Sequence, residues 1–297
     1  MRSEPRLGAP RTPSRTCMSM VNHIESVRDS FRAPGSPLVS VIVPTHNRCQ
    51  LLRETVASVL AQTMRDFELI IVSDGSTDGT WTVIETIGDP RIVFVEQSPS
   101  GRPAVPRNRG LILARGKYIA LCDDDDLWRV EKLAKQVALM ERDPSLGLCY
   151  TNSVTLRNGR TGAQPRLKSG EYVRDFNELL WRNYICNSSV VAPRRVFEAV
   201  GPFDEEPLLC PFDDYEMWLR VAHRFPIAYI DEPLVVYRVH DSNIVSRFAE
   251  RELIVIRVLR TVMKKLQTHR IALGLSIALR FGKYLASALR GHKYRVR

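Results

Sequence analysis

From Lys117 to Trp128 the sequence reads KYIALCDDDDLW, an apolar segment that runs directly into four consecutive aspartates. The apolar part is typical of a buried β-strand, so the aspartates stand where the strand ends. Isolated buried carboxylates are unfavourable unless a cation or hydrogen-bond donors compensate them, and carboxylates this close raise one another's pKa values. The segment therefore predicts a strand whose carboxyl end needs a positively charged partner.

Strand-like and helix-like segments alternate on both sides of this stretch. Continuous apolar, β-branched runs at Leu38–Pro44 (LVSVIVP) and at 67–74 (FELIIVSD) predict strands buried on both faces. Segments with apolar residues at helical spacing separate them, the clearest being RVEKLAKQVALMERDP at 129–144. This alternation predicts an α/β fold with a doubly wound, mostly parallel sheet, in which ligands bind beyond the carboxyl ends of the strands.

The second half of the chain has a mixed pattern. Periodicity weakens at 153–167, and short strands are then expected at 188–192 (SSVVA), 227–230 (IAYI) and 234–239 (LVVYRV), with helices between them. No linker separates this half, so we expect it to extend the same sheet. The predicted organisation is a disordered basic arm at 1–36, one α/β domain at 37–246 and a basic helical extension at 247–297.

Charge is spread unevenly along the 297 residues. The formal net charge is +10, and residues 247–297 alone carry 13 Lys/Arg against 2 Asp/Glu. Such a basic end predicts contact with an anionic surface, either lipid or nucleic acid; a solvated basic helix is the alternative. If that surface is lipid, the expected location is the inner face of the plasma membrane.

Cysteines and apolar runs bear on location. The six cysteines show no CxxC or metal-type spacing, as expected for reduced thiols in a cytoplasmic protein. The N-terminal segment lacks the apolar centre of a secretory signal. The longest uncharged run near the C-terminus, Ile271–Leu279, is far shorter than the roughly 20 residues of a spanning helix. We therefore expect a cytoplasmic protein without transmembrane helices.

Two acidic turns follow predicted strands. The run Asp123–Asp126 suits a hard divalent cation such as Mg²⁺ or Mn²⁺, with the diphosphate of a nucleotide as co-ligand; the alternative is a cap for a helix that begins at Arg129. In SDGSTDGT, Asp74 ends a strand and could accept hydrogen bonds from a base or ribose, while Asp78 suits a helix cap. No GxGxxG is present, which argues against a dehydrogenase.

Other polar groups remain open in function. Asp213 and Asp214 precede an amphipathic helix and could either cap it or supply a general base for an acceptor hydroxyl. Arg107 and Asn108 suit phosphate binding or helix solvation. Arg238 and His240, in YRVH, could touch a diphosphate or a metal, although a lone histidine is more often structural; for this reason His240 is only a secondary candidate ligand.

Together these segments resemble a family 2 glycosyltransferase of the GT-A fold. The matching pieces, in the family's order over roughly residues 37–243, are VSVIVPTHNR, LLRETVASVLAQT, DFELIIVSDGSTDGT, ARGKYIALCDDDDLW, KLAKQVALME, GPFDEE and DDYEMWLR. The resemblance implies a nucleotide-sugar donor, a divalent cation (Mn²⁺ or Mg²⁺) and inversion at the anomeric carbon.

The resemblance also implies roles for single positions on the donor side. It places the nucleotide beside Pro44, Thr45, His46 and Asn47, with His46 where an aromatic residue often packs on the base. It implies that Asp74 reads the base. Arg107 and Asn108 are also expected to bind the nucleotide-sugar donor.

The metal-binding DxD motif and the catalytic ED motif also have counterparts. Asp123 and Asp125 satisfy the DxD spacing, whereas Asp124 and Asp125 match the pair that contacts ribose and metal; Asp125 is the expected direct ligand. Asp214 matches the catalytic aspartate, with Asp213 in place of the usual glutamate. Asp214 is thus the expected general base.

Two departures from the family pattern limit what is expected. Ser73 replaces the first aspartate of the common DDGS, which leaves Asp74 alone, and no QxxRW follows Asp214, which argues against processive polymerisation. The expectation is transfer of one sugar to a glycan or lipid-linked acceptor in cell-envelope polysaccharide synthesis, with no nucleic-acid partner. A sugar-phosphate nucleotidyltransferase and a non-catalytic scaffold that binds nucleotides or nucleic acid are the alternatives.

Overall fold

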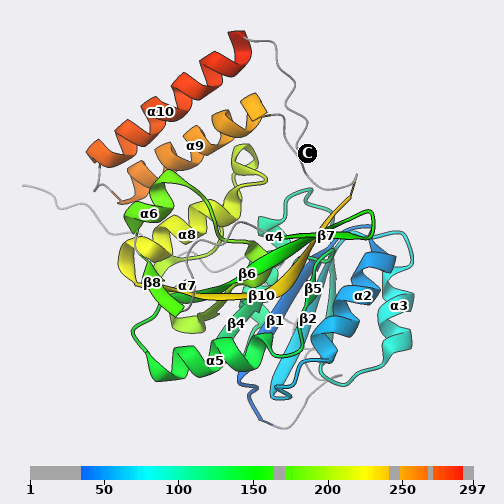
Figure 1. Cartoon of the computed structure of the whole chain (residues 1–297). Helices are drawn as coiled ribbons and strands as arrows, with labels where there is room; N and C mark the ends of the chain where they lie inside the picture. Colours follow the sequence, from blue (N-terminus) through cyan, green and yellow to red (C-terminus); the bar gives the residue numbers. More distant parts are fainter. Residues whose placement is uncertain (1–34, 164–170, 175, 241–247, 267–269, 290–297) are drawn as a thin grey trace, which may run out of the picture.

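The computed structural model describes residues 35–163, 171–174, 176–240, 248–266 and 270–289 (Figure 1). Residues 1–34 of the expected N-terminal arm lie outside the described residues. A single mixed sheet runs through the molecule, with strand order β3-β2-β1-β4-β9-β6-β10-β5. Strands β7 and β8 pair with β6 and β10 at its side.

The first half of the sheet is parallel, as the continuous apolar runs predict. Its strands are β1 (Val39–Thr45), β2 (Phe67–Asp74), β3 (Ile92–Gln97) and β4 (Tyr118–Leu121). Val39 of β1 aligns with Phe67 on one side and Tyr118 on the other. Because the three strands run the same way in this register, their carboxyl ends meet at one edge of the sheet.

Helices cover both faces of this half. They are α2 (Cys49–Leu60), α3 (Thr80–Ile87), α4 (Ala104–Leu113) and α5 (Lys132–Arg142). Val41 and Val43 of β1 pack in one core with residues of α2, α3 and α5, whereas Ile42 packs in the opposite core with α4. A Cβ on Gly110 would lie 2.4 Å from Ile42, so glycine there allows α4 to approach β1 closely. The doubly wound arrangement is therefore confirmed.

The second half is mixed. Its strands are β5 (Leu127–Trp128), β6 (Leu148–Arg157), β7 (Arg160–Ala163), β8 (Glu171–Arg174), β9 (Val191–Pro193) and β10 (Ile227–Val239). β9 lies antiparallel to β4, and β10 is parallel to β6. The weakly periodic stretch after residue 153 proves to be the end of β6 and its hairpin partner β7.

Three sequence-based expectations about the chain after the four aspartates were wrong. The strand expected at 188–192 begins only at Val191, because Asn187–Ser189 form a 3₁₀ helix. The two strands expected at 227–230 and 234–239 form one strand, β10, because the register shifts on either side of Pro233 without ending the pairing with β6. The helix expected from Arg129 begins at Lys132, because Leu127 and Trp128 pair with β10 first.

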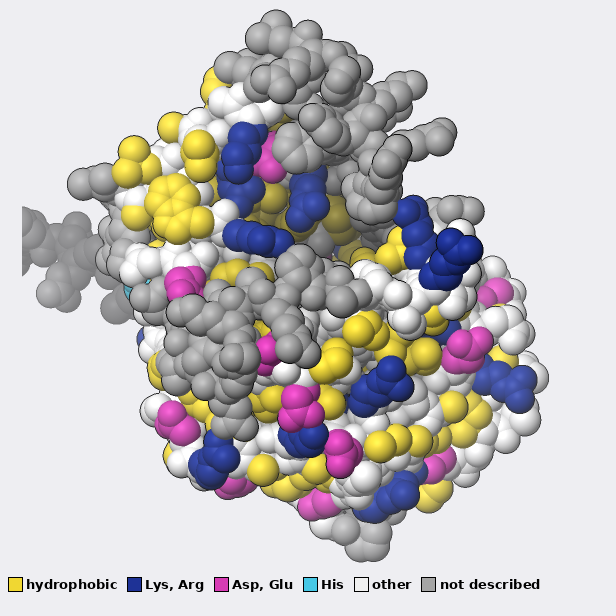
Figure 2. Space-filling view, viewed as in Figure 1, with side chains coloured by type: hydrophobic (Ala, Val, Ile, Leu, Met, Phe, Trp, Pro, Cys, Tyr) yellow, Lys and Arg dark blue, Asp and Glu magenta, His cyan; other side chains and the backbone are white. Residues whose placement is uncertain are grey.

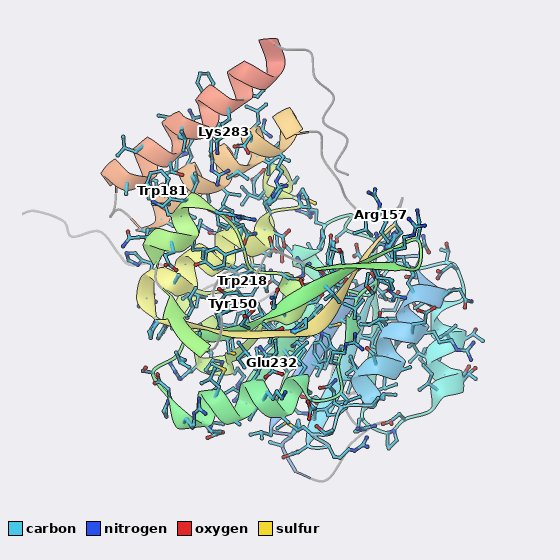
Figure 3. The ribbon with its side chains drawn as sticks, viewed as in Figure 1. Tyr150, Arg157, Trp181, Trp218, Glu232 and Lys283 are labelled. Carbon is cyan, nitrogen blue, oxygen red and sulfur yellow. The ribbon has the colours of Figure 1, made fainter. Side chains whose placement is uncertain are left out.

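The helices of the second half pack with those of the C-terminal extension (Figure 1). They are α6 (Phe176–Trp181), α7 (Arg194–Val200), α8 (Asp213–Arg224), α9 (Phe248–Leu266) and α10 (Arg270–Leu289), with short 3₁₀ helices η1 (Asn187–Ser189) and η2 (Pro207–Leu209). Helix α9 packs against α8, and α10 packs against α9. Tyr150 of β6 and Trp218 of α8 lie in the interior between sheet and helices (Figure 3), whereas Lys283 of α10 is exposed.

The C-terminal helices belong to the same core as the rest of the fold. Val255, Val258 and Val262 of α9 are buried in the cluster that contains Trp218 of α8. The expected basic helical extension is therefore packed against the α/β domain. No helix among the described residues is both long and apolar enough to cross a membrane.

Candidate active site

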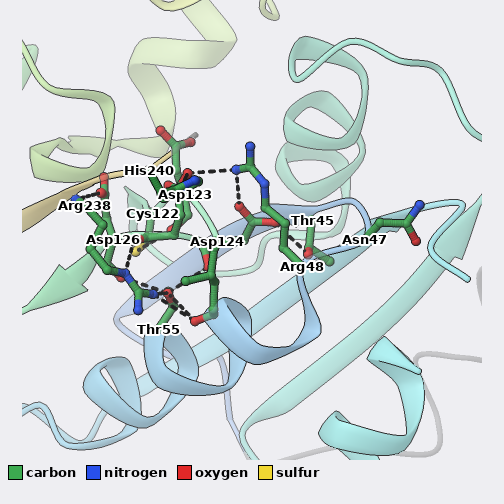
Figure 4. Close-up of polar contacts among 12 residues, drawn as sticks. Thr45, Asn47, Arg48, Thr55, Cys122, Asp123, Asp124, Asp126, Arg238 and His240 are labelled. Atoms are coloured by element: carbon green, nitrogen blue, oxygen red, sulfur yellow. Dashed lines mark hydrogen bonds and ion pairs between the residues drawn. The ribbon is translucent and has the colours of Figure 1, made fainter. Parts of the chain in front are cut away.

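The four aspartates form a turn at the end of β4 (Figure 4). The backbone N–H of Asp126 donates to the carbonyl of Asp123 at 3.2 Å and closes the turn. Helix α5 starts six residues later, and its N-cap position is occupied by Glu131. The alternative that these aspartates cap the following helix is therefore wrong.

Asp126 is the structural member of the run. It is fully buried, accepts a hydrogen bond from the Ser188 hydroxyl at 2.5 Å and accepts another from the backbone N–H of Arg238 at 3.1 Å. Burial first, and then the charges of its neighbours Asp125 and Asp123, raise the pKa of Asp126 well above its usual range. These bonds attach the turn to η1 and β10.

Arg238 connects the acidic turn to α2. Its guanidinium donates to the carbonyl oxygens of Asp125 and of Leu51 in α2, and to the Thr55 hydroxyl at 3.1 Å. It is 7% exposed. These bonds fasten the acidic turn to α2, so a contact of Arg238 with a diphosphate stays a prediction that its position does not favour.

Asp124 and Asp125 share one cationic partner that the sequence analysis missed. Nη1 of Arg48, the residue before α2, lies 3.0 Å from Oδ1 of Asp124 and 2.8 Å from Oδ2 of Asp125 (Figure 4). Thr45 donates to Asp124 at 2.8 Å. Burial raises the pKa of Asp124 to about 6, although Arg48 opposes the shift. The conspicuous four-aspartate run implied a positive partner, but no spacing rule identified Arg48.

Asp125 also meets His240. Nε2 of His240 lies 3.1 Å from the same Oδ2 that contacts Arg48. Burial and the nearby Asp123 raise the pKa of Asp125, and Arg48 and His240 oppose that shift. The structure thus brings together the carboxylate and the imidazole that the sequence analysis had named as candidate metal ligands.

Arg107 connects the acidic turn to α8. One of its terminal nitrogens lies 2.8 Å from Asp123 and the other 2.7 Å from Asp213. Asn187 donates to the same oxygen of Asp123 at 2.8 Å. Burial opposes the charge of Arg107, but Asp123, Asp213 and Asp214 outweigh it, and the pKa of the guanidinium is raised. Two acidic segments 90 residues apart in the sequence are therefore neighbours.

Asp213 and Asp214 differ in how accessible they are. They open α8, but Phe212 holds the N-cap position and the cap makes no side-chain hydrogen bond within the described residues. Asp213 is 2% exposed and engaged with Arg107, whereas Asp214 is partly exposed. Burial among its neighbours, and then the charge of Asp213, raise the pKa of Asp214 to about 7, with Arg107 opposing. Asp214 is the one of the two that can meet a substrate.

The other expected donor-binding residues join the ends of β1 and β2. The carboxylate of Asp74 accepts hydrogen bonds from Gln97, from the N–H and hydroxyl of Ser100, and from the N–H of Gly101. Nδ1 of His46 donates to the carbonyl of Asp74 at 2.8 Å. Asp74 therefore orders the loop after β3, and its contact with a base stays a prediction, as does the stacking of a base on His46.

The remaining expected residues occupy three places. Asn47 has a positive φ of 52° and accepts a hydrogen bond from the N–H of Thr77 at 2.7 Å, and the partly buried Pro44 lies two residues before His46 at the end of β1. Gly79 occupies the N-cap of α3, and Asp78 accepts from the N–H of Thr80, the first residue of α3, at 3.3 Å and from the N–H of Cys49, the first residue of α2, at 2.8 Å. Donor binding by Pro44 and Asn47 stays a prediction.

Asn108 faces a different segment. Its amide donates to the carbonyl of Phe203 at 2.9 Å and to Glu205 at 2.8 Å, and its oxygen accepts from the N–H of Phe203. It therefore fixes the GPFDEE segment before α8. A contact with the donor stays a prediction.

The residues present fit a divalent cation that brings ligands of its own. Within the described ranges, no group of three or more His, Cys, Asp and Glu is arranged to hold a metal ion. Asp125 and His240 nevertheless offer one oxygen and one nitrogen 3.1 Å apart. Cations that act on nucleotides often take only one or two protein ligands and complete their shell with phosphate oxygens and water.

Comparison with known proteins gives a consistent picture. The family model described as glycosyl transferase family 2 matches residues 40–201. WfaP of Escherichia coli, a UDP-Glc:α-D-GlcNAc-diphosphoundecaprenol β-1,3-glucosyltransferase, is 29% identical over 72% of this chain and 82% of its own. TuaG of Bacillus subtilis, named for teichuronic acid biosynthesis, is 33% identical over 71% of this chain and 82% of its own.

Solved structures show the same fold at low sequence identity. Residues 1–349 of Staphylococcus aureus TarS in complex with UDP-GlcNAc match with a TM-score of 0.66 and 19% identity, over 84% of this chain and 72% of that one. The mannosyltransferase PcManGT of Pyrobaculum calidifontis, in complex with GDP-Man and Mn²⁺, matches with a TM-score of 0.59 and 19% identity, over 93% of this chain and 84% of that one. These matches confirm the expected GT-A fold. The chain belongs to glycosyl transferase family 2.

Proposed function

We propose that this glycosyltransferase moves one sugar, with inversion and with the help of a divalent cation, from a nucleotide-sugar donor to a glycan or lipid-linked acceptor of the cell envelope. The observation that carries the proposal is the Arg107 bridge, which sets the acidic turn after β4 beside Asp213 and Asp214 at the start of α8. A cation-binding edge and an accessible carboxylate in one site are the parts that such a transfer requires.

The relatives support the choice of substrates. WfaP is named for a UDP-glucose donor and an undecaprenol-linked acceptor, and TuaG for an envelope polymer. TarS and PcManGT were solved with a nucleotide sugar. WfaP is also named for a β-1,3 product, and UDP-glucose carries its sugar in α-linkage, so that transfer inverts the anomeric carbon.

Asp214 is the proposed general base. Its partly exposed carboxylate accepts a hydrogen bond from the backbone N–H of Tyr215 at 2.6 Å, which fixes the orientation of the side chain at the helix start. A pKa of about 7 allows the carboxylate to take the proton of an acceptor hydroxyl near neutral pH. That oxygen then attacks the anomeric carbon from the face opposite the diphosphate, and one displacement inverts the configuration.

The donor side uses other groups of the chain. Asp125 and His240 would hold the cation, which when bound supplies positive charge to the departing diphosphate. Asp124, whose carboxylate is oriented by Thr45, is placed to accept hydrogen bonds from the ribose. Arg107 forms ion pairs with both Asp123 and Asp213, and so holds the donor and acceptor sides at a fixed separation.

A donor screen tests the nucleotide. Thermal unfolding with Mn²⁺ and each of UDP-, GDP-, dTDP- and CMP-sugars should show a higher melting temperature for one base, because a ligand that binds only the native state stabilises it. The product made from that donor should then show the inverted anomeric configuration by NMR. A product that retains the donor's configuration would exclude the single displacement.

The C-terminal helices are the proposed contact with an anionic membrane surface. Trp181 of α6 and Leu275, Leu279 and Phe281 of α10 are large apolar side chains that are roughly half exposed. Lys283 on α10 is exposed as well, and Figure 2 shows hydrophobic and basic side chains next to one another over this part of the molecule. Apolar side chains bordered by basic ones suit insertion among anionic head groups.

Deletion of the C-terminal helices is a poor test of this contact, because α9 completes the core under α8. Substitutions at the surface are better. Partition of the full chain onto vesicles of phosphatidylglycerol and phosphatidylcholine should fall in a Leu279→Ser/Lys283→Glu variant and stay the same in Ile112→Ser, which alters an exposed apolar side chain on α4. Equal partition of both variants and the unaltered chain would refute the contact.

A further inference from the structure

We propose that Arg48 is a built-in counter-ion of the acidic turn, which must leave Asp124 and Asp125 when a divalent cation arrives with the donor diphosphate. The inference rests on the proposed function, because it concerns the same cation. It adds an exchange step: in the absence of the donor, the guanidinium of Arg48 occupies the position beside Asp125 that the cation would take.

The first support is the placement of Arg48 between two buried carboxylates. Asp124 and Asp125 have side chains that are 6% and 7% exposed, and a single nitrogen of Arg48 lies within 3.0 Å of both. Two adjacent carboxylates out of water need a cation nearby. Arg48 meets this need where Asp125 also meets His240, the pair to which the proposed function assigns the cation.

The second support is competition for one oxygen atom. Arg48 and His240 both contact Oδ2 of Asp125, at 2.8 and 3.1 Å. A divalent cation held between Asp125 and His240 would therefore stand next to the guanidinium. Two positive groups at such a distance repel strongly in a poorly solvated site, so the guanidinium and the cation exclude one another.

The third support is that the side chain of Arg48 is more exposed than those of the other two arginines of the site. Its side chain is 22% exposed, whereas the side chains of Arg107 and Arg238 are each 8% exposed and donate to several acceptors. The backbone of Arg48 is itself held, since its carbonyl accepts from Leu52 at 2.9 Å and the preceding Asn47 is fixed to Thr77. We therefore expect displacement of Arg48 to involve the side chain and not the backbone.

The consequence is that cation binding depends on the donor. A free cation must displace Arg48 from its two carboxylates and offers the guanidinium no new partner. A cation that arrives with a diphosphate brings phosphate oxygens with which the displaced guanidinium can pair. The bare protein should therefore bind Mn²⁺ weakly, and removing the charge of Arg48 should strengthen that binding about tenfold or more, the scale measured for loss of one close charge interaction.

Isothermal titration of the full chain with Mn²⁺ alone tests the inference. Arg48→Met should bind Mn²⁺ about tenfold or more tightly than the unaltered chain, which corresponds to ~1.4 kcal/mol or more. Arg53→Met is the matched control, because it removes the same charge from an exposed position on α2, the helix that Arg48 precedes, and should change the affinity less than about twofold. Mn²⁺ affinity in Arg48→Met equal to or weaker than that of the unaltered chain would overturn the inference.

Two further measurements keep the outcomes distinct. Titration with Mn²⁺ plus an equimolar mixture of UDP, GDP, dTDP and CDP tests the proposed function: no uptake by the unaltered chain refutes the cation-dependent transferase itself. Normal uptake with no gain in Arg48→Met refutes only the counter-ion. If Arg48→Met fails to fold, Arg48→Gln removes the charge and keeps a hydrogen-bond donor, and it carries the same expected gain and the same contradicting result.

Discussion

Replacing Arg107 with methionine should destabilise the fold because the change leaves a buried carboxylate without its partner. The side chain of Arg107 is 8% exposed, and its guanidinium lies 2.7 Å from Asp213, whose side chain is 3% exposed. Removing one member of a buried ion pair costs about 3–5 kcal/mol of unfolding free energy. Asp123 adds little to this, since it is 28% exposed and keeps its hydrogen bond from Asn187. The expected loss is therefore about 3–5 kcal/mol.

Urea denaturation at pH 8 measures this loss, with Arg194→Met as the control. Arg194 pairs with Glu198 on the surface of α7, and both are largely exposed, so its loss should cost about 0.5 kcal/mol or less. Adding Asp213→Asn to Arg107→Met should restore at least about 1 kcal/mol, because the unpaired charge is removed. A loss in Arg107→Met no larger than in Arg194→Met would refute the buried bridge.

The loss of stability in Arg107→Met should depend on pH. Burial already raises the pKa of Asp213, and Arg107 opposes that shift. Without Arg107 the pKa of Asp213 rises further. Above that raised pKa the folded state contains an unpaired, buried carboxylate, which destabilises it; below that pKa the carboxyl is protonated and the penalty disappears. The stability deficit of Arg107→Met should therefore be full at pH 8 and shrink as the pH falls toward 5. A deficit that is constant over this range would contradict the reasoning.

Two other expectations concern catalysis and the turn between β2 and α3. Since Asp214 acts as a base only when ionised and its pKa is raised to about 7, kcat/KM should fall on the acidic side with a midpoint near 7; activity unchanged down to pH 5 would contradict this role. A Cβ on Gly75 would lie 2.7 Å from Pro99, whereas Gly79 has open space, and both have positive φ. Gly75→Ala should thus lower the melting temperature and raise the donor KM more than Gly79→Ala, and equal effects would show that the contact with Pro99 is unimportant.

The parallel half of the sheet could be predicted because its signal is local. Every residue of β2 is buried, and β1 is buried except for the partly buried Pro44, so their sequences are continuous apolar runs that need no knowledge of partners. The carboxylates at the strand ends were equally visible, since a parallel sheet brings such ends together. His240 was only a secondary candidate ligand, and its contact with Asp125 was not predicted from the sequence.

The partners of those carboxylates could not be predicted, because they depend on contacts between distant segments. Arg48 meets Asp124 across 76 positions and Arg107 meets Asp213 across 106, and one arginine resembles another in the sequence. The single strand β10 was missed for a different reason: its irregular register near Pro233 interrupts the apolar alternation without ending the hydrogen bonding.

The central claim is that Asp214 performs base catalysis beside a cation-dependent donor site. The most direct test is the release of nucleoside diphosphate from the preferred donor, with acceptor present, in the unaltered chain and in Asp214→Asn. We expect release that requires Mn²⁺ or Mg²⁺ and that falls by about 10² to 10⁴ in kcat in Asp214→Asn, while nucleotide binding persists. Release that continues at the original rate in Asp214→Asn, or that is unaffected by chelation of divalent cations, would contradict the account.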